Sequence, residues 1–344
     1  MTFVRNCWYV AGWSDDFTHA LTCRTILSED IVLYRTSKGE VAAFLDVCPH
    51  RKLPLSKGRL IGDALQCGYH GLTFDCSGKC VRIPGQDSTN TSISVVKKYP
   101  VKEHMGMVWL WMGDPALAEE TPIFDLPQYH DKDWSAAHGD GLFYEANYLL
   151  LADNLCDPAH VSFVHKSTLG NEGSEDVPIE TRFEDDCVIT HRWINDSKPI
   201  PLFEKFGNFS GNVDRWHYYY YYAPNIAIID FGSADAGTGA QEGGGTNRIQ
   251  IYACHFMTPV TESQTIDYWL HVKNFVPESA EVDQKMSDQF RIAFSEDQAI
   301  LEGCQKQEDA GHTWRPVRLA IDKGPIRMRK MVDKMIAAEA AEAV

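Results

Sequence analysis

The sequence predicts an α+β protein, with an all-β N-terminal domain and a C-terminal domain built on an antiparallel sheet. Its 344 residues suffice for about two domains. Short apolar or alternating runs separated by turn residues dominate the first 113 positions, whereas longer strands and helical stretches follow. The charge balance also changes near residue 113, because 13 basic and 10 acidic residues precede it while 19 and 38 follow.

The predicted N-terminal domain spans residues 1–113. Its strand-like runs are bounded by turns at 37–40 and 76–79. They lie at 24–27, 31–35, 41–45, 71–75 and 107–112. A connector rich in proline and acidic residues is predicted at 114–134, and the second domain is predicted at 135–344.

The predicted second domain begins with a helix at 144–151, where the apolar positions follow the helical period. Five strand-like runs separated by glycine, asparagine and aspartate predict an antiparallel meander. They lie at 187–193, 215–222, 227–231, 248–256 and 264–272. The glycine-rich stretch 237–245 lacks the residues of a phosphate-binding loop, so we expect a surface turn there. Helices at 278–310 and 326–343 complete the domain.

Composition excludes several classes of protein. No segment reaches ~18 consecutive apolar residues, so no membrane span is predicted. The first residues show no apolar signal-peptide core, which predicts a cytoplasmic protein. A net charge of −16 makes nucleic acid an unfavourable partner. The uneven charge would also allow the less acidic half of one subunit to dock on the acidic half of another.

Four of the ten cysteines lie between positions 48 and 80, and two of these belong to a metal-binding pattern. The pattern is Cys48-x-His50 followed by Cys67-x2-His70. In a reducing cytosol, clustered cysteines and histidines more often ligate a metal than form disulfides. This spacing is typical of a Rieske [2Fe-2S] cluster, in which two thiolates hold one iron and two imidazoles the other. A Cys2His2 zinc site is the alternative, although neither half resembles the paired-histidine helix of a zinc finger.

A second metal site is predicted at 153–165. His160 and His165 are five residues apart, and Asp157 lies three residues before the first. Two neutral imidazoles and a carboxylate from elsewhere form the facial triad that binds Fe(II) and leaves positions open for O2. On a straight α-helix the two imidazoles would point about 140° apart. We therefore expect a local widening toward i→i+5 bonds, made easier by Pro158.

Spacing does not decide which carboxylate completes this triad. Asp283, Asp288 and Asp297 all lie in the predicted helix 278–310. Any single one of them more often belongs to a solvated helix face. The two histidines could likewise be unrelated, but a one-electron cluster needs an acceptor, and an iron with open positions is a suitable one.

The two patterns resemble the signatures of the Rieske non-haem iron oxygenases, and the similarity extends over essentially the whole chain. The chain is most similar to the vanillate O-demethylase oxygenase group, which includes dicamba monooxygenase and toluenesulfonate methyl-monooxygenase. The shorter pieces that carry this likeness are 3–11, 83–86, 153–155 and 214–216. The resemblance implies a helix-grip catalytic domain after the Rieske domain.

The resemblance also implies roles for single residues. It selects Asp297 as the third iron ligand. Asp157 corresponds to a residue that links an iron-ligand histidine to a cluster histidine of the neighbouring subunit, and Asn154 corresponds to an asparagine close to the iron. A homotrimer is implied, with electrons coming from NAD(P)H through a flavin/[2Fe-2S] reductase.

The predicted function is the oxygenase component of a monooxygenase that demethylates a methoxy-aromatic acid to a phenol and formaldehyde. Hydroxylation of an aryl methyl group, as in a toluenesulfonate, and ring hydroxylation are alternatives within this class. Two other classes of protein are less compatible with the sequence. The long chain after the cluster domain argues against a Rieske electron carrier, and the complete His-His-Asp set argues against a ligand-binding module without chemistry. His255, in the predicted strand 248–256, is a candidate substrate contact, and a structural histidine is the alternative.

Overall fold

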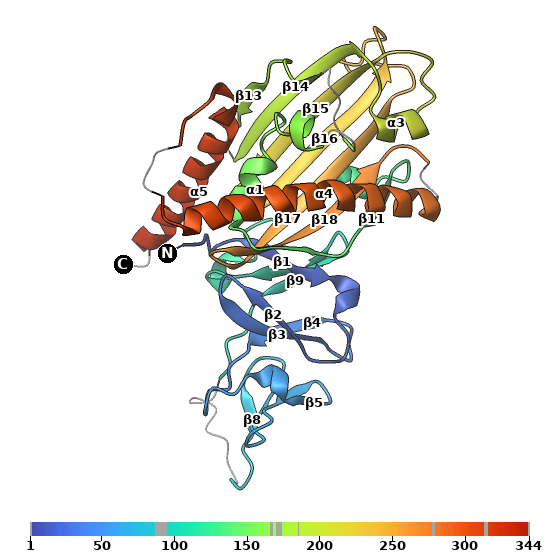
Figure 1. Ribbon diagram of the computed structural model, residues 1–344. Helices are drawn as coiled ribbons and strands as arrows, with labels where there is room; N and C mark the ends of the chain where they lie inside the picture. Colours follow the sequence, from blue (N-terminus) through green and yellow to red (C-terminus); the bar gives the residue numbers. More distant parts are fainter. Residues whose placement is uncertain are drawn as a thin grey trace. The chain divides into compact units, whose positions relative to one another are not determined.

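The computed structural model describes residues 2–86, 95–165, 168–169, 174–184, 186–276, 279–312 and 316–342. The chain forms two compact units (Figure 1). The first comprises residues 1–124 and 258–262, and the second comprises 125–257 and 263–344. The division falls inside the predicted connector 114–134. Glu278 and Ala343, at the ends of two predicted helices, lie outside the described residues.

The first unit is built from short antiparallel strands, which confirms the predicted all-β class. One sheet has the order β1 (Trp8–Trp13), β10 (Met107–Trp111) and β9 (Val101–His104). A second has β2 (Thr22–Ile26), β3 (Glu29–Arg35) and β4 (Val41–Leu45). A four-stranded sheet has β5 (Arg59–Ile61), β6 (Ala64–Gln66), β7 (Thr73–Phe74) and β8 (Cys80–Arg82).

The predicted strand at 71–75 is wrong at its start, because only Thr73 and Phe74 pair as a strand. Gly71 has φ +72°, a left-handed conformation that glycine adopts without a steric cost. Its N–H donates to the carbonyl of Cys67 (3.1 Å). Residue 71 therefore closes a loop instead of extending β7.

The second unit confirms the predicted antiparallel meander. Its sheet has the order β11-β18-β17-β16-β15-β14-β13, and β12 (Leu142–Tyr144) also pairs with β18. Neighbours in this sheet are mostly neighbours in sequence, which is the definition of a meander. The strands are β11 (Ser135–His138), β13 (Glu180–Phe183), β14 (Cys187–Ser197), β15 (Val213–Tyr222), β16 (Ile226–Asp235), β17 (Ile249–Thr261) and β18 (Gln264–Lys273).

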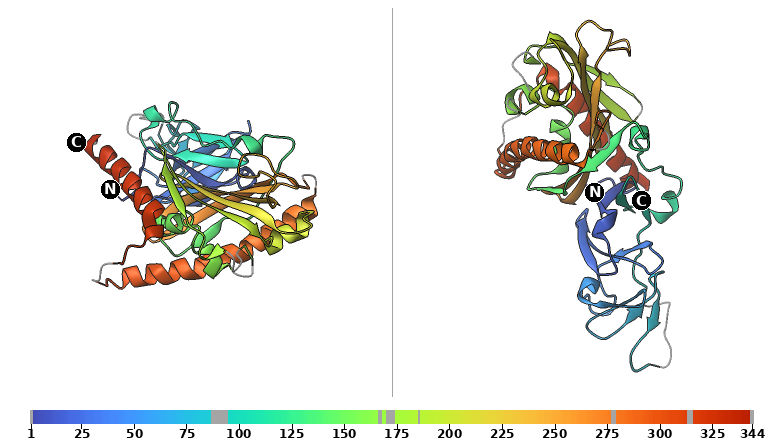
Figure 2. Two further views of the ribbon diagram at one scale, coloured as in Figure 1. Left: turned by 90° about the horizontal axis from the view of Figure 1, so that it is seen from above. Right: turned by 90° about the vertical axis from the view of Figure 1, so that its right-hand side faces the viewer.

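Five α-helices belong to the described part of this unit: α1 (Tyr148–Asn154), α2 (Val161–Val164), α3 (Pro201–Phe206), α4 (Ala280–Asp309) and α5 (Lys323–Glu342). Helix α4 crosses one face of the sheet (Figures 1 and 2). Its Phe290 and Phe294 are buried there, with ring contacts to Phe231 and Trp269. None of the described helices combines the length and apolar character that crossing a bilayer requires.

The predicted helix 144–151 starts four residues later than expected. The side chain of Asn147 accepts a hydrogen bond from the Leu149 N–H (2.8 Å) and caps α1, which begins at Tyr148. Tyr144 belongs instead to β12. The apolar positions before Asn147 follow the helical period, but the pairing of β12 with β18 overrides that local pattern.

Candidate metal centres and active-site pocket

The two cysteine loops of the first unit have the same backbone conformation. In each loop the cysteine N–H donates to the carbonyl five residues later, and the cysteine carbonyl accepts from the N–H four residues later. The residue at that fourth position has a positive φ in both, +60° for Lys52 and +72° for Gly71. The loops that begin at Cys48 and Cys67 therefore present their side chains in equivalent ways.

Buried thiols and exposed imidazoles are combined at these loops. Cys48 and Cys67 are buried, while His50 and His70 are exposed with ring centroids 4.6 Å apart. Burial raises the pKa of the Cys48 thiol, and the adjacent Cys67 raises it further. A metal that binds both thiolates would remove this penalty. Two convergent thiols beside two imidazoles fit the ligand set of a Rieske [2Fe-2S] cluster.

The second candidate metal centre joins three side chains that are far apart in sequence. The Nε2 atom of His160 lies 3.7 Å from Oδ1 of Asp297, and Nε2 of His165 lies 3.2 Å from Oδ2 of the same carboxylate. The two rings have centroids 5.2 Å apart. The two imidazoles and the carboxylate therefore converge as the facial donor set for Fe(II) requires.

The expected widening of the helix between the two histidines is wrong. Helix α2 is a single turn with ordinary i→i+4 bonds, from the Val164 N–H to the His160 carbonyl (2.8 Å) and from the His165 N–H to the Val161 carbonyl (3.1 Å). His160 precedes this turn, and His165 leaves it with φ −102° and ψ 33°. The imidazoles converge because they flank one short turn, which a straight helix would not allow.

Asp157 contacts His160 through its backbone. The Nδ1–H of His160 donates to the Asp157 carbonyl oxygen (2.6 Å), whereas the nearest carboxylate oxygen of Asp157 is 4.0 Å from Nδ1. The carboxylate instead accepts from the Ala159 N–H (2.7 Å). Because Nδ1 donates, Nε2 keeps the lone pair that faces Asp297. In this conformation it is the backbone of Asp157, and not its carboxylate, that accepts the hydrogen bond from the imidazole.

Glu296 orients the other histidine. Its Oε2 accepts from Nδ1 of His165 (2.8 Å) and from the hydroxyl of Thr168 (3.2 Å). Asn154 donates to Oδ1 of Asp297 (2.9 Å), so each of the three donors has a fixed orientation. Glu296 could not be identified from the sequence, in which its position directly before Asp297 is the one signal.

The electrostatics of this centre favour a bound cation. Burial lowers the pKa of His165, but the carboxylates of Asp297 and Glu296 outweigh it and raise the pKa. Burial raises the pKa of Asp297, but the contacts with His165 and His160 outweigh it and lower the pKa. The site therefore holds an ionised carboxylate beside a readily protonated imidazole, and a divalent metal would replace that proton.

Replacing Glu296 by glutamine is expected to weaken iron binding about 10- to 100-fold, because a carboxylate that accepts from a metal-bound imidazole raises its basicity. The measurement is the iron retained against a competing chelator. Glu281→Gln, at an exposed ion pair with Lys285 on the same helix, is the matched control and should leave the affinity unchanged. Equal iron affinity in the two variants would remove Glu296 from the site.

A cavity adjoins this centre within the second unit, and its lining is largely apolar. A largely apolar lining with a few polar groups is typical of a site for a small organic ligand. The polar lining consists of the three metal donors together with Asn154, His217, Tyr219 and His255. The apolar lining consists of Leu155, Val161, Leu169, Ile229, Phe231, Ala253, Phe290 and Phe294.

His255, the candidate substrate contact, is one of these lining residues. Its Nδ1 is 2.7 Å from Oδ2 of the buried Asp267, and its ring packs edge-on against Phe294. The carboxylate fixes the ring and leaves Nε2 for another partner. His217 and Tyr219 were not identified from the sequence, because nothing distinguished them from other alternating residues of β15.

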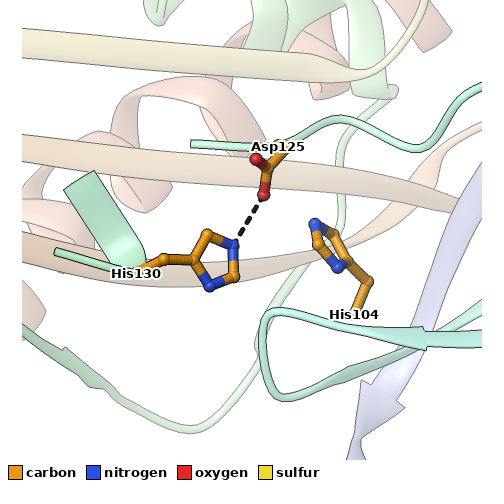
Figure 3. Close-up of side chains that lie close together, drawn as sticks. All are labelled: His104, Asp125 and His130. Carbon is orange, nitrogen blue, oxygen red and sulfur yellow. Dashed lines mark hydrogen bonds and ion pairs between the residues drawn. The ribbon is translucent and has the colours of Figure 1, made fainter. Parts of the chain in front are cut away.

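A further histidine–carboxylate contact lies at the start of the second unit. Nε2 of His130 is 2.8 Å from Oδ1 of Asp125 (Figure 3), and both side chains are about half exposed. Neither residue lines the cavity. Exposed pairs of this kind contribute little to stability.

Two family models match the chain. The Rieske [2Fe-2S] domain matches residues 7–100, and the vanillate O-demethylase oxygenase C-terminal domain matches residues 144–338. Together these matches contain all seven metal-binding side chains considered above. They correspond to the two units of the structure.

Curated proteins are similar over nearly the full length. The iron-sulfur subunit of the toluene-4-sulfonate monooxygenase system of Comamonas testosteroni is 36% identical, over 98% of both chains. The vanillate O-demethylase oxygenase subunit of a Pseudomonas species is 34% identical, over 98% of this chain and 96% of the relative. The dicamba O-demethylase oxygenase component of Stenotrophomonas maltophilia is 32% identical, over 99% and 100%.

Solved structures agree with these similarities. Dicamba monooxygenase bound to 3,6-dichlorosalicylic acid superposes with a TM-score of 0.91 at 30% identity, covering 99% of this chain and 100% of the other. The same enzyme with non-haem iron and dicamba gives a TM-score of 0.84 at 30% identity and the same coverage. The cofactors are thus a Rieske [2Fe-2S] cluster and a mononuclear iron. This chain belongs to the Rieske non-haem iron oxygenases of the vanillate O-demethylase group and is the oxygenase component of a monooxygenase.

Proposed function

We propose that this oxygenase removes the methyl group of a methoxy-substituted aromatic acid, releasing a phenol and formaldehyde. The observation that carries the proposal is the convergence of His160, His165 and Asp297 on a largely apolar cavity whose lining includes phenylalanine rings. Fe(II) held by these three side chains would supply O2 activation next to the substrate. The cluster would be held by Cys48, His50, Cys67 and His70 and would supply electrons.

The residues that line the cavity would exclude water, orient the substrate and hold the metal ligand in place. The apolar walls exclude water, which protects the reaction from side products and strengthens the electrostatic interactions inside. Phe290 and Phe294 of α4 would pack against the aromatic ring and limit its orientation. Asn154 keeps the Asp297 carboxylate fixed through its hydrogen bond. His255, held by Asp267, offers Nε2 to a polar group of the substrate.

An oxygenase component depends on a separate reductase. We propose that this partner carries a flavin and a [2Fe-2S] cluster and draws electrons from NAD(P)H. We further propose a homotrimer, in which Asp157 links the iron site of one subunit to the cluster of the next. The opposite charge balances of the N-terminal and C-terminal parts of the sequence, +3 and −19, support such a head-to-tail contact.

A second candidate is hydroxylation of a methyl group attached directly to an aromatic ring. It is favoured by the relative with 36% identity, whose name specifies toluene-4-sulfonate. Ring hydroxylation is a third candidate, which the apolar cavity beside the iron centre also permits. All three reactions use the same iron centre and differ in the substrate position that faces it.

A substrate panel tests the proposal. The purified oxygenase, with an NADH-dependent reductase of this family, is offered 4-methoxybenzoate, vanillate, 4-toluenesulfonate and benzoate. Demethylation predicts formaldehyde in an amount equal to the NADH consumed, and only with the two methoxy acids. NADH consumption with an alcohol product from 4-toluenesulfonate and no formaldehyde would favour methyl hydroxylation instead. Dihydroxylated or ring-hydroxylated benzoate as the main product would select the third candidate.

A further inference from the structure

Four polar side chains lie together on the face of the sheet that carries the cavity. Arg192 on β14 is directly opposite His217 on β15, which is opposite Phe231 on β16. Directly opposed residues point to the same face, and Phe231 lines the cavity. Arg215 is two residues before His217 and therefore shares this face, as does Ser233 opposite it.

Three of these side chains have buried polar atoms without a hydrogen-bond partner in the part of the chain that the structure describes. They are Nδ1 of His217, Nε and Nη2 of Arg192, and Oγ of Ser233. Arg192 is only 2% exposed, and its guanidinium donates from Nη1 to the Ser174 carbonyl (2.8 Å). Buried polar groups without partners are rare in folded proteins and often mark functional sites.

The cluster brings buried cationic side chains close together, which disfavours their charged forms. Burial lowers the pKa of Arg192, and the nearby Tyr219 and Asp157 offset only part of that effect. Burial and the charge of Arg192 lower the pKa of Arg215 to about 10. Burial and both guanidinium groups hold the pKa of His217 well below its usual range. Among the described residues, no carboxylate forms an ion pair with Arg192. An anion in the cavity would therefore offset part of the free-energy cost of burying this uncompensated positive charge.

We propose that His217 binds the anionic group of the aromatic substrate, and that Arg192 behind it is the positioning residue that supplies positive charge. His217 reaches the cavity, whereas Arg192 is directly across the strand pair from it. The inference rests on the proposed function only in taking the ligand to be an aromatic acid. Carboxylate and sulfonate share the required chemistry, since both are oxyanions that accept several hydrogen bonds.

Calorimetric titration of the holoenzyme tests this directly. The probes are 4-methoxybenzoate, 4-toluenesulfonate and the neutral methyl ester of 4-methoxybenzoate. We expect the preferred anion to bind about 10- to 100-fold more tightly than the ester, as charge-assisted hydrogen bonds predict. Arg192→Met should remove most of that preference while leaving the affinity for the ester unchanged.

Thermal unfolding without ligand separates this role from a purely structural one. Removing an uncompensated buried cation is expected to leave the melting temperature of Arg192→Met unchanged or higher. Lys273→Met is the matched control: Lys273 is equally buried, but it pairs with Asp283 (2.9 Å) and donates to two carbonyls. That variant should therefore melt at a lower temperature.

Three outcomes would overturn the inference. One is an unchanged preference for the anion in Arg192→Met. Another is a melting temperature that falls in Arg192→Met as much as in Lys273→Met. The third is a preference that survives Arg192→Met but disappears in His255→Gln, which would place the anion at His255. If the protein prefers the anions in the titration but releases no formaldehyde from the methoxy acids, the proposed demethylation is wrong and the anion site still stands.

Discussion

Replacing His160 by alanine is expected to remove the mononuclear iron while the visible absorption of the [2Fe-2S] cluster stays unchanged. The proposed ligands of the two centres belong to separate compact units, 1–124 with 258–262 and 125–257 with 263–344. Loss of one imidazole from a three-ligand site leaves only His165 and Asp297, too few donors for tight binding. Turnover should fall at least about 1,000-fold, because several kcal/mol of stabilisation by the metal are lost.

The measurement is iron per subunit together with the cluster spectrum. We expect about three irons in the parent protein and about two in the variant, from the two ligand sets. His138→Ala, at an exposed histidine on β11, should keep all three. A His160→Ala protein that lost its cluster and kept the mononuclear iron would reverse the assignment of the two sites.

The cluster loops were predictable from sequence because each loop carries its ligands within four residues. Spacing alone therefore described the local geometry, and the two equivalent turns at Cys48 and Cys67 confirm that the segments are alike. The iron site was predictable only in part. His160 and His165 are local to one segment, but Asp297 lies more than 130 residues away and reaches them only through the packing of α4 on the sheet.

The polar side chains of the cavity could not be predicted for a different reason. Arg192 and His217 look like ordinary members of alternating strands, where polar residues usually face solvent. Their burial depends on the register of β14 with β15 and on the segments packed against that face, such as Ser174 beside Arg192. Register and layer packing are set by many distant contacts, and no local pattern records them. The same reasoning applies to Glu296, whose contact with His165 depends on how α4 is rotated.

Replacing Asp157 by asparagine is expected to keep both metals and to slow electron transfer between them about 10- to 100-fold, the range for residues that contact metal ligands. The structure explains why the iron should stay. The backbone carbonyl of residue 157 holds the His160 imidazole, and an asparagine oxygen can still accept from the Ala159 N–H. In the unsubstituted protein, the second carboxylate oxygen of Asp157 is the one that would accept from His70 of the partner subunit in the proposed homotrimer.

The alternative is that Asp157 only caps the turn before α2. The chain offers a matched control, because Asp114-Pro115-Ala116 repeats the Asp157-Pro158-Ala159 sequence, and the Asp114 carboxylate accepts from the Ala116 N–H in the same way (3.0 Å). Asp114→Asn should show the small stability loss of a weakened cap and nothing else. Single-turnover kinetics of the pre-reduced protein decide between the roles. If the cluster is reoxidised slowly by substrate and O2 in Asp157→Asn but not in Asp114→Asn, the link between the iron site and the neighbouring cluster is supported. If reoxidation is normal in both variants, Asp157 acts only as a helix cap.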